Sequence, residues 1–341
     1  MKLDKVLSFD DVLLVPKYNP VRSRSEVSLA TQVGGLSLES PILGANMPSV
    51  CGHEMATALS SEGALGIIHR MCSIEKQASM VQKSEGYVGA AIGIGDDWKE
   101  RAAACIDGGA HIICVDVAHG DQDRVVEVSR QFLEEFDVPL IIGNIATEDA
   151  ARSFIMGLCM EDQSRVALKA GVGGGSLCST RVKTGFGLPT LESVWRISAA
   201  LEKYGSPMSL IADGGLKNSG DICKSLAAGA DAVMLGSLLS GTDEAPGDVV
   251  KNGDALYKMY AGSASHGAKK KFFGKAEYIE GAERLVPYKG PVQKIVQGLH
   301  EGIRSGMTYA GASNLEEFQV KAEFVQITAA GYRESIPHGL L

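Results

Sequence analysis

The stretch VALKAGVGGGSLCSTR, residues 166–181, joins a short apolar run to a glycine-rich loop that carries a cysteine. The run Val166–Ala170 has the length of a buried strand, and the loop continues from Gly171 to Arg181. Glycine permits backbone conformations closed to other residues and lets a ligand approach the main chain closely. A cysteine is a good nucleophile when its thiol is reachable and its pKa is lowered. This is a candidate catalytic or anion-binding loop, although a flexible turn beside a buried cysteine would have the same pattern.

Short apolar runs alternate with stretches of helical period on both sides of this loop. Such alternation predicts parallel β-α units, and unbroken apolar strands indicate burial on both faces. Eight units close naturally into an α/β fold of the (β/α)8 TIM barrel type. The alternative is a doubly wound open sheet, which is less favoured because no GxGxxG motif follows the first strand. The eight runs are Pro41–Ala45, Leu65–His69, Val88–Ile92, His111–Val115, Pro139–Gly143, Val166–Ala170, Ser209–Ala212 and Ala232–Leu235.

Several segments lie outside this repeat. The N-terminal extension Leu7–Pro16 is predicted to form a short helix or an arm across the barrel, and Glu26–Leu36 alternates like a β-ribbon. A long segment after the eighth strand, at about 260–290, is predicted to be a mobile lid. Residues 292–305 have the period of a further barrel helix. No internal domain boundary is evident, so we expect one barrel domain over residues 1–341.

The composition is that of a soluble globular enzyme. The chain has 341 residues, 45% hydrophobic and 22% charged, with a formal net charge of −8. Negative charge argues against broad binding to nucleic acids or anionic membranes. No apolar run reaches the roughly 18 residues of a membrane span, and the N-terminus lacks the apolar core of a signal peptide. The seven cysteines are scattered without CxxC spacing, which predicts a reducing, cytoplasmic location.

Polar residues and glycines follow nearly every predicted strand. In a TIM barrel the chemistry lies at these C-terminal strand ends. Glycines after the seventh and eighth strands, at Gly214-Gly215 and Gly236-Ser237, predict a phosphate site built from backbone N–H groups. The alternative is that these glycines have only a structural role, in allowing the chain to turn. The other residues at strand ends are Asn46-Met47, His69-Arg70, Asp116, Asn144 and Asp213.

Together these motifs resemble the IMP dehydrogenase and GMP reductase family, over almost the whole chain. Gly173–Thr180 is similar to the catalytic cysteine loop of the family. Leu7–Pro16 resembles its opening signature, and Asn46-Met47 matches the end of its first strand. The remaining matches are Ile211–Gly215 and Met234–Ser237, which resemble its phosphate loops, and Val286–Pro291 and Gly302–Gly311 near the C-terminus.

Within this family the chain looks most like a GMP reductase. Dehydrogenases usually carry paired regulatory CBS modules after the second β-α unit, whereas here Ile67–Arg70 leads through one helix to Val88. The mobile flap of a dehydrogenase supplies an adjacent Arg–Tyr pair that activates water, and no arginine lies between Gly262 and Glu283. The segments 260–265 and 241–247 also resemble a bacterial type of GMP reductase.

Other features differ from that pattern. Residues 69–77 and 327–335 look more like the dehydrogenases. Pro48-Ser49 stands where the family usually has Asp-Thr, and Gly174 stands where reductases usually have proline. The open alternatives are an IMP dehydrogenase without CBS domains, a reductase of a related purine nucleotide, and a non-catalytic purine-nucleotide-binding protein. Residues 157–164 replace a short turn and have no evident role.

The resemblance implies NADPH-dependent reductive deamination of GMP to IMP and ammonia. Cys178 would attack C2 of the purine and form a thioimidate, and Thr180 with Glu280 would relay protons to the leaving ammonia. Taken alone, Glu280 could be a surface acid, Thr180 a helix cap, and Asp116 a partner of loop N–H groups. A homotetramer is also implied.

The resemblance also assigns binding residues. Asp213 would hold the ribose, Met47 would pack on the base, and Ser176 would contact the phosphate. Carbonyls of Gly173, Gly175 and Cys178 could hold a potassium ion. The full substrate-binding set is Met47, Asn144, Ser176, Asp213, Gly214, Gly215, Gly236, Ser237, Tyr260, Gly262, Ser263 and Gly281; the cofactor-binding set is Arg70, Asp116, Ala118 and Gly120.

Overall fold

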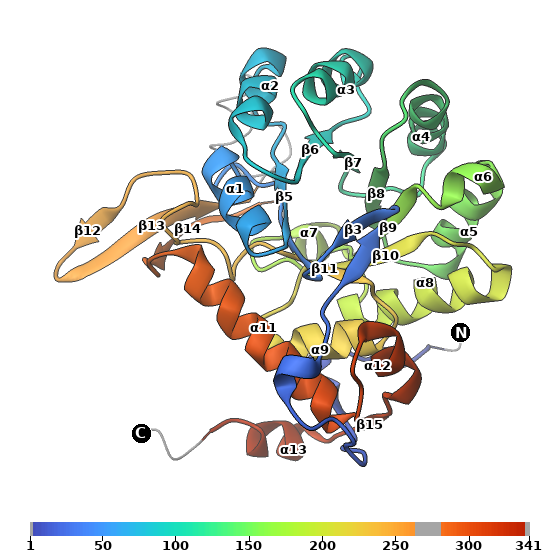
Figure 1. Cartoon of the computed structure of the whole chain (residues 1–341), viewed down its shortest axis with the longest axis vertical. Coiled ribbons are helices and arrows are strands. Elements are labelled where there is room, and N and C mark those ends of the chain that lie inside the picture. Colours follow the sequence, from blue (N-terminus) through green and yellow to red (C-terminus); the bar gives the residue numbers. More distant parts are fainter. Residues whose placement is uncertain (1–2, 263–280, 338–341) are drawn as a thin grey trace.

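A closed barrel of eight parallel strands lies at the centre of the computed structural model, which describes residues 3–262 and 281–337 (Figure 1). The barrel strands pair in chain order from β4 to β11, and β11 closes onto β4. The predicted α/β TIM barrel is therefore confirmed, with each strand over or beside its predicted apolar run. The strands are β4 (Ile42–Gly44), β5 (Leu65–Ile68), β6 (Val88–Ile92), β7 (Ile112–Asp116), β8 (Leu140–Ile145), β9 (Val166–Ala170), β10 (Ser209–Asp213) and β11 (Ala232–Leu235).

Helices surround the barrel, and side-chain caps mark the start of several (Figure 1). Ser73, Thr147 and Asn218 each accept a backbone N–H bond from the first turn of the helix that follows. The chain passes from the end of β5 at Ile68 to the start of α2 at Ile74. These helices are α1 (His53–Ser61), α2 (Ile74–Lys83), α3 (Trp98–Asp107), α4 (Asp123–Glu135), α5 (Glu148–Gly157), α6 (Met160–Gln163), α8 (Thr190–Tyr204), α9 (Ser219–Ala227) and α11 (Val292–Tyr309). A further short helix, α7 (Thr180–Thr184), follows the cysteine loop at the end of the barrel.

A hairpin covers the N-terminal end of the barrel. Its strands are β2 (Thr31–Val33) and β3 (Leu36–Leu38), and the fully buried Val33 packs with the residues of the barrel interior. The predicted ribbon over 26–36 was misplaced, because the hairpin turns at Gly34-Gly35, where φ is +56° and +80°. A two-residue turn with both φ values positive matches the twist of paired strands, and glycine adopts it without steric cost. Glu26 instead ends a short 3-10 helix, Arg24–Glu26.

The N-terminal extension forms both of the structures that its sequence suggested. A 3-10 turn at Phe9–Asp11 leads into β1 (Val12–Leu14), which pairs antiparallel with β15 (Phe324–Gln326). Buried Phe9 and an ion pair between Asp10 and Lys217 hold this arm against the barrel. The remaining elements near the C-terminus are α12 (Leu315–Lys321) and α13 (Ala329–Glu334).

Two further segments extend from the barrel wall. A three-stranded antiparallel sheet of β12 (Val250–Asn252), β13 (Ala255–Ala261) and β14 (Glu283–Pro287) projects to one side (Figure 1). Residues 157–164 contain the short helix α6 (Met160–Gln163), in which buried Gln163 donates to the carbonyls of Ile155 and Leu158. The Gln163 side chain therefore caps backbone carbonyl groups at the C-terminal end of α5. None of the helices in the described part of the chain is both long and apolar enough to span a membrane.

Candidate active site

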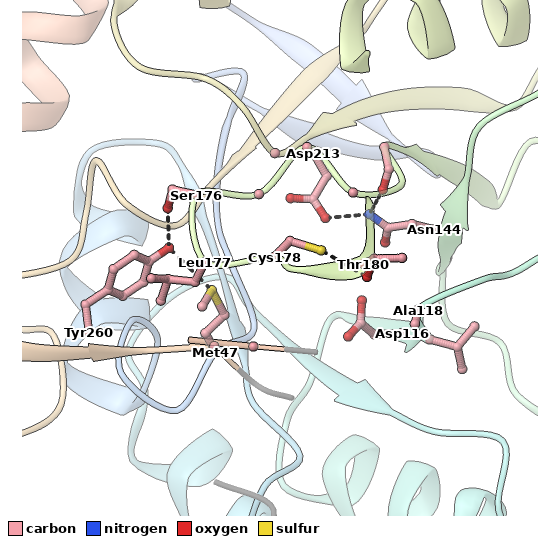
Figure 2. Close-up of a pocket in the computed structure, with 18 of the residues that line it drawn as sticks. Met47, Asp116, Ala118, Asn144, Ser176, Leu177, Cys178, Thr180, Asp213 and Tyr260 are labelled. Carbon is pink, nitrogen blue, oxygen red and sulfur yellow. Dashed lines mark hydrogen bonds between the residues drawn. The ribbon is translucent and has the colours of Figure 1, made fainter. Parts of the chain in front are cut away.

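A cavity of about 400 Å³ lies at the C-terminal ends of the barrel strands (Figure 2). This volume is within the usual range for small-molecule sites. Cys178 and Thr180 occupy the centre of the view, with Tyr260 and Met47 on one side and Asp116 and Ala118 on the other (Figure 2). The predicted residues that line it are Met47, Arg70, Asp116, Ala118, Asn144, Gly173, Gly175, Ser176, Cys178, Thr180, Asp213, Gly214, Tyr260, Gly262 and Gly281.

The cysteine loop runs from the end of β9 to the start of α7. At Gly171, φ is +142° and a Cβ atom would lie 2.0 Å from the carbonyl oxygen of Asp213, so a side chain cannot be accommodated. The Cys178 N–H bonds to the Gly175 carbonyl, which turns the loop and leaves the cysteine exposed. Its Sγ donates to the Thr180 Oγ1 at 3.2 Å. The N-cap of α7 is Ser179, so Thr180 is not the capping residue.

The two flanks of the predicted lid meet at the cysteine loop. Cys178 forms an isolated antiparallel bridge with Gly281, and the Ala282 N–H donates to the Leu177 carbonyl. The Gly262 N–H donates to the Ala282 carbonyl in turn. Backbone hydrogen bonds therefore connect both flanks to the cysteine loop. Ser263, Glu280 and the rest of the lid between them lie outside the described residues.

Tyr260 borders the side of the cavity that faces the predicted phosphate loops. Its hydroxyl lies 3.4 Å from the Ser176 Oγ and 3.9 Å from the Met47 sulfur, and burial raises the pKa of the phenol. A Cβ at Gly236 would lie 3.0 Å from the same hydroxyl, so this glycine sits directly behind it. Of the predicted residues in the described ranges, Gly120, Gly215, Gly236 and Ser237 do not line the cavity. The Gly120 N–H instead bonds to the Asn144 carbonyl.

Lys169 lies beneath the cavity and was not predicted as a site residue. Its side chain is 1% exposed, and Nζ donates to Asp116 Oδ1 at 2.8 Å, to Asp213 Oδ2 at 2.9 Å and to Asn144 Oδ1. Burial by itself lowers the pKa of Lys169, but the two carboxylates raise it above its ordinary value. Burial opposes the ionisation of Asp116, yet Lys169 holds the pKa of this carboxyl below its usual range. The main partner of the Asp116 carboxylate is thus an ammonium, not loop N–H groups.

The structure gives a physical account of both departures from the family pattern. Ser49 forms two bonds with one residue of β13, donating to the Ala261 carbonyl at 2.9 Å and accepting its N–H at 3.0 Å. Ser49 therefore tethers the loop after β4 to the base of the lid. At Gly174, a Cβ would lie 2.4 Å from the Thr190 Oγ1. The Thr190 hydroxyl fills the space that a side chain at position 174 would need.

The cavity lining includes two residues that the sequence did not single out, Met71 and Val117. It also includes Gly171, Gly174 and Leu177, which belong to the predicted cysteine loop but were assigned no individual binding role. Met71 and Val117 are immediate neighbours of predicted residues, and their place at strand ends alone does not distinguish them. Lys169 carried a clearer signal, because it is the charged residue in an otherwise apolar strand run. A buried lysine requires opposite charges close by, and acidic residues end two other strands of the barrel.

The predicted potassium ligands are backbone carbonyls. Within residues 3–262 and 281–337, no cluster of three or more His, Cys, Asp or Glu side chains is arranged to hold a metal ion. Carbonyl oxygens would have to serve instead, and the Gly175 carbonyl already accepts the Cys178 N–H. A carbonyl has two lone pairs, so this oxygen retains capacity for a cation.

Comparisons with known proteins agree over nearly the full chain. The family model described as "IMP dehydrogenase / GMP reductase domain" matches residues 6–338. Inosine-5′-monophosphate dehydrogenase from Cryptosporidium parvum is 33% identical, covering 98% of this chain and 96% of its own. GMP reductase from Leishmania major is 31% identical, covering 99% and 98%.

A solved structure gives the same result. GMP reductase from Trypanosoma brucei, a cysteine-to-alanine variant in complex with guanosine 5′-monophosphate, superposes with a TM-score of 0.93 at 29% identity. The match covers 99% of each chain. The resemblance inferred from the sequence is confirmed, and this chain belongs to the IMP dehydrogenase and GMP reductase family of nicotinamide-dependent oxidoreductases.

Proposed function

We propose that this protein is a GMP reductase that converts GMP to IMP and ammonia with NADPH. The observation that carries the proposal is the exposed Cys178 thiol, hydrogen-bonded to Thr180 in a single cavity that extends to both sides of it (Figure 2). The side with Met47 and Tyr260 suits a purine nucleotide. The side with Asp116 and Ala118 suits a nicotinamide ring.

The chemistry of the first step follows from the pair at its centre. The Cys178 sulfur attacks C2 of the guanine, an S–C2 bond forms, and the bond between C2 and the exocyclic nitrogen breaks. Ammonia leaves readily only when it takes up a proton. A hydroxyl both accepts and donates, so Thr180 takes the thiol proton and passes its own toward the departing nitrogen. Glu280, outside the described residues, is the proposed second member of this relay. The product is a thioimidate on Cys178.

The nucleotide is held at three points in this proposal. Met47 packs against the purine, and Asp213 accepts hydrogen bonds from the ribose hydroxyls. The phosphate contacts Ser176 and the Tyr260 hydroxyl, which line the cavity. The N–H groups of Gly215, Gly236 and Ser237, which lie outside the lining, are the further phosphate contacts in this proposal. Lys289 adds positive charge there, because its Nζ donates to the carbonyls of Ser237 and Leu238 on the same loop.

The residues on the other side of Cys178 fit a nicotinamide cofactor. Met71, Val117 and Ala118 offer apolar surface for a flat ring, and Arg70 and Asp116 offer polar groups for an amide. NADPH, when bound there, would supply a hydride to C2 of the thioimidate. The bond between C2 and the Cys178 sulfur would then break, which releases IMP and returns the cysteine as a thiolate. A reductase must keep water away from the thioimidate, because hydrolysis would give xanthosine monophosphate instead of IMP. A potassium ion on the carbonyls of Gly173, Gly175 and Cys178 would hold the cysteine loop in its reactive shape.

The reductase is favoured over the dehydrogenase by the lid. Hydrolysis of the covalent intermediate in a dehydrogenase relies on an arginine of the flap, and the sequence between Gly262 and Glu283 has none. The second candidate is an IMP dehydrogenase, because relatives with that name are as similar as those named GMP reductase, at 33% and 31% identity.

Product analysis tests the proposal. The full-length protein is incubated with GMP and NADPH deuterated at the transferable position of its nicotinamide. A reductase yields IMP with deuterium at C2 and one ammonia per cofactor oxidised. Formation of xanthosine monophosphate from IMP and NAD⁺, without IMP formation from GMP, would establish the dehydrogenase instead.

A further inference from the structure

Lys169 directs all three of its ammonium protons at groups on other barrel strands. Its partners are Asp116 at the end of β7, Asn144 on β8 and Asp213 at the end of β10. An ammonium has three donors and no acceptor, so these bonds use its whole capacity. The side chain is 1% exposed and cannot reach a ligand itself. Whatever it does for the reaction is done through its partners.

The partners are also bonded to one another. The Asn144 Nδ2 donates to Asp213 Oδ2 at 2.9 Å (Figure 2). The same oxygen accepts from Lys169. Asn46 donates to the carboxylate of Asp116 from the end of β4. The network therefore joins two carboxylates that line the cavity, those of Asp116 and Asp213, through a buried lysine.

The arrangement leaves one oxygen of Asp213 for a ligand. Both side-chain bonds found in the described structure fall on Oδ2, and Figure 2 shows the other oxygen turned away from Asn144. Rotation of the carboxylate would break the bonds to Lys169 and Asn144 together. Lys169 thereby fixes the direction in which the free oxygen points.

Lys169 also makes two neighbouring carboxylates compatible. Oxygens of Asp116 and Asp213 lie within 2.9 Å of the same nitrogen, so they are close to each other. Without a cation between them, like charges at short range disfavour joint ionisation and push the groups apart or onto a shared proton. The ammonium removes this repulsion and keeps both groups anionic.

We infer that Lys169 is a positioning residue, which aims Asp213 at the ribose of the nucleotide and holds Asp116 at the cofactor side. This inference rests on the proposed function for the identity of the nucleotide. A role in barrel stability alone would weaken binding of every ligand alike. A positioning role instead predicts a selective loss, confined to the hydroxyls that Asp213 receives.

The test compares GMP with 2′,3′-dideoxyguanosine 5′-monophosphate, which lacks both ribose hydroxyls. Their dissociation constants are measured by calorimetry on the full-length wild type, on Lys169→Met and on Lys258→Met. Lys258 is a matched control, because it is also buried but donates to the backbone carbonyls of Thr242, Asp243 and Ala245. Loss of the Lys258 ammonium should lower the stability of the fold and leave the ribose site unchanged.

We expect the wild type to prefer GMP by roughly 100-fold, since a site built for hydroxyls leaves its acceptor unpaired with the analogue. Lys169→Met should reduce this preference to below about 10-fold, mainly by weakening GMP binding. Lys258→Met should keep the wild-type preference. A folded Lys169→Met protein with the wild-type preference would overturn the inference, and so would a wild type without any preference.

A double variant covers the case in which Lys169→Met does not fold. In Asp116→Asn/Lys169→Met, one of the two uncompensated, partly buried carboxylates is removed as well, so the repulsion between them is lost and the cost of burial falls. We expect the same reduced preference there, and retention of the wild-type preference would contradict the inference. If the wild type shows the preference but does not turn over GMP, the reductase proposal fails while the positioning role is still judged by this ratio.

Discussion

The Cys178 Sγ and the Thr180 Oγ1 are 3.2 Å apart, with the thiol as donor, at the end of the loop that leaves β9. The nucleophile thus begins in contact with the group that we propose as its proton relay. Because Thr180 is the first residue of α7, its backbone is fixed by the helix while its hydroxyl faces the cavity.

Thr180→Val should lower kcat for GMP roughly 100-fold or more, because the leaving ammonia loses its proton donor. KM should change little, since the shape of the side chain is kept. Steady-state kinetics with saturating NADPH measure both. Thr184→Val is the matched control on the same helix, where the hydroxyl donates only to the Thr180 carbonyl and accepts the Phe186 N–H. Equal losses of kcat in Thr180→Val and Thr184→Val would show that the effect comes from a change in the helix and not from loss of a proton donor.

Gly174→Ala should reduce both stability and activity, because the new Cβ meets the Thr190 Oγ1 at 2.4 Å. Thr190→Ala removes that atom, which in the described structure is buried and has no hydrogen-bond partner. The double variant should therefore be less destabilised than the sum of the single variants, by about 1 kcal/mol or more. Thermal or urea unfolding of the four proteins measures this coupling. Additive changes in the free energy of unfolding would mean that the side chains at positions 174 and 190 do not compete for the same space.

Ser49→Ala should raise KM for GMP about fivefold, because the loop after β4 loses both bonds to Ala261 next to the cavity-lining Gly262. Ser49→Thr keeps the hydroxyl and should retain near wild-type kinetics. Comparison of the KM for GMP in Ser49→Ala and Ser49→Thr tests whether the two hydrogen bonds to Ala261 support substrate binding. An unchanged KM in Ser49→Ala would show that the base of the lid is held by other contacts.

Asp231→Asn should stabilise the protein at neutral pH. Burial raises the pKa of Asp231 to about 6 from 3.8, so the folded state binds a proton more readily than the unfolded state. The ionised carboxyl therefore costs stability, and this cost grows as the pH rises from about 4 to 6. The asparagine oxygen can still accept the Leu210 N–H that Asp231 accepts at 2.7 Å.

The expected gain is on the order of 2 kcal/mol at pH 7, and it should vanish near pH 4. Urea unfolding at the two pH values measures it. Asp254→Asn, at an exposed turn between β12 and β13, is the control and should change stability little at either pH. A gain at pH 7 that persists at pH 4 would contradict the electrostatic explanation.

The barrel could be predicted because its signal is local. Each strand is a short apolar run of its own, as in Ile112–Asp116, and β-α alternation fixes the order of the strands around the barrel. Site residues at strand ends, such as Asn144 and Asp213, were located because that topology brings all the C-terminal ends to one face.

What the sequence did not reveal depends on contacts between distant residues. Lys169 lies in a run that looks wholly buried, and its partners are 53 and 44 residues away in the chain. The fit of Gly174 against Thr190, and of Ser49 against Ala261, depends on loop geometry that no periodic pattern encodes. The hairpin boundary was misplaced because alternation begins before the strands themselves do.

The central claim is that Cys178 catalyses the reductive deamination of GMP. The most direct measurement is a paired spectrophotometric assay, with GMP and NADPH in one cuvette and IMP, NAD⁺ and potassium in the other. Wild type, Cys178→Ala and Cys159→Ala are compared, since Cys159 is also an exposed free cysteine but stands between α5 and α6 and does not line the cavity.

The account predicts NADPH loss with equal ammonia release in the first cuvette, abolished in Cys178→Ala and unchanged in Cys159→Ala. Formation of NADH in the second cuvette, with no reaction in the first, would contradict it. That result would mean that a dehydrogenase in this family activates water without an arginine in its flap.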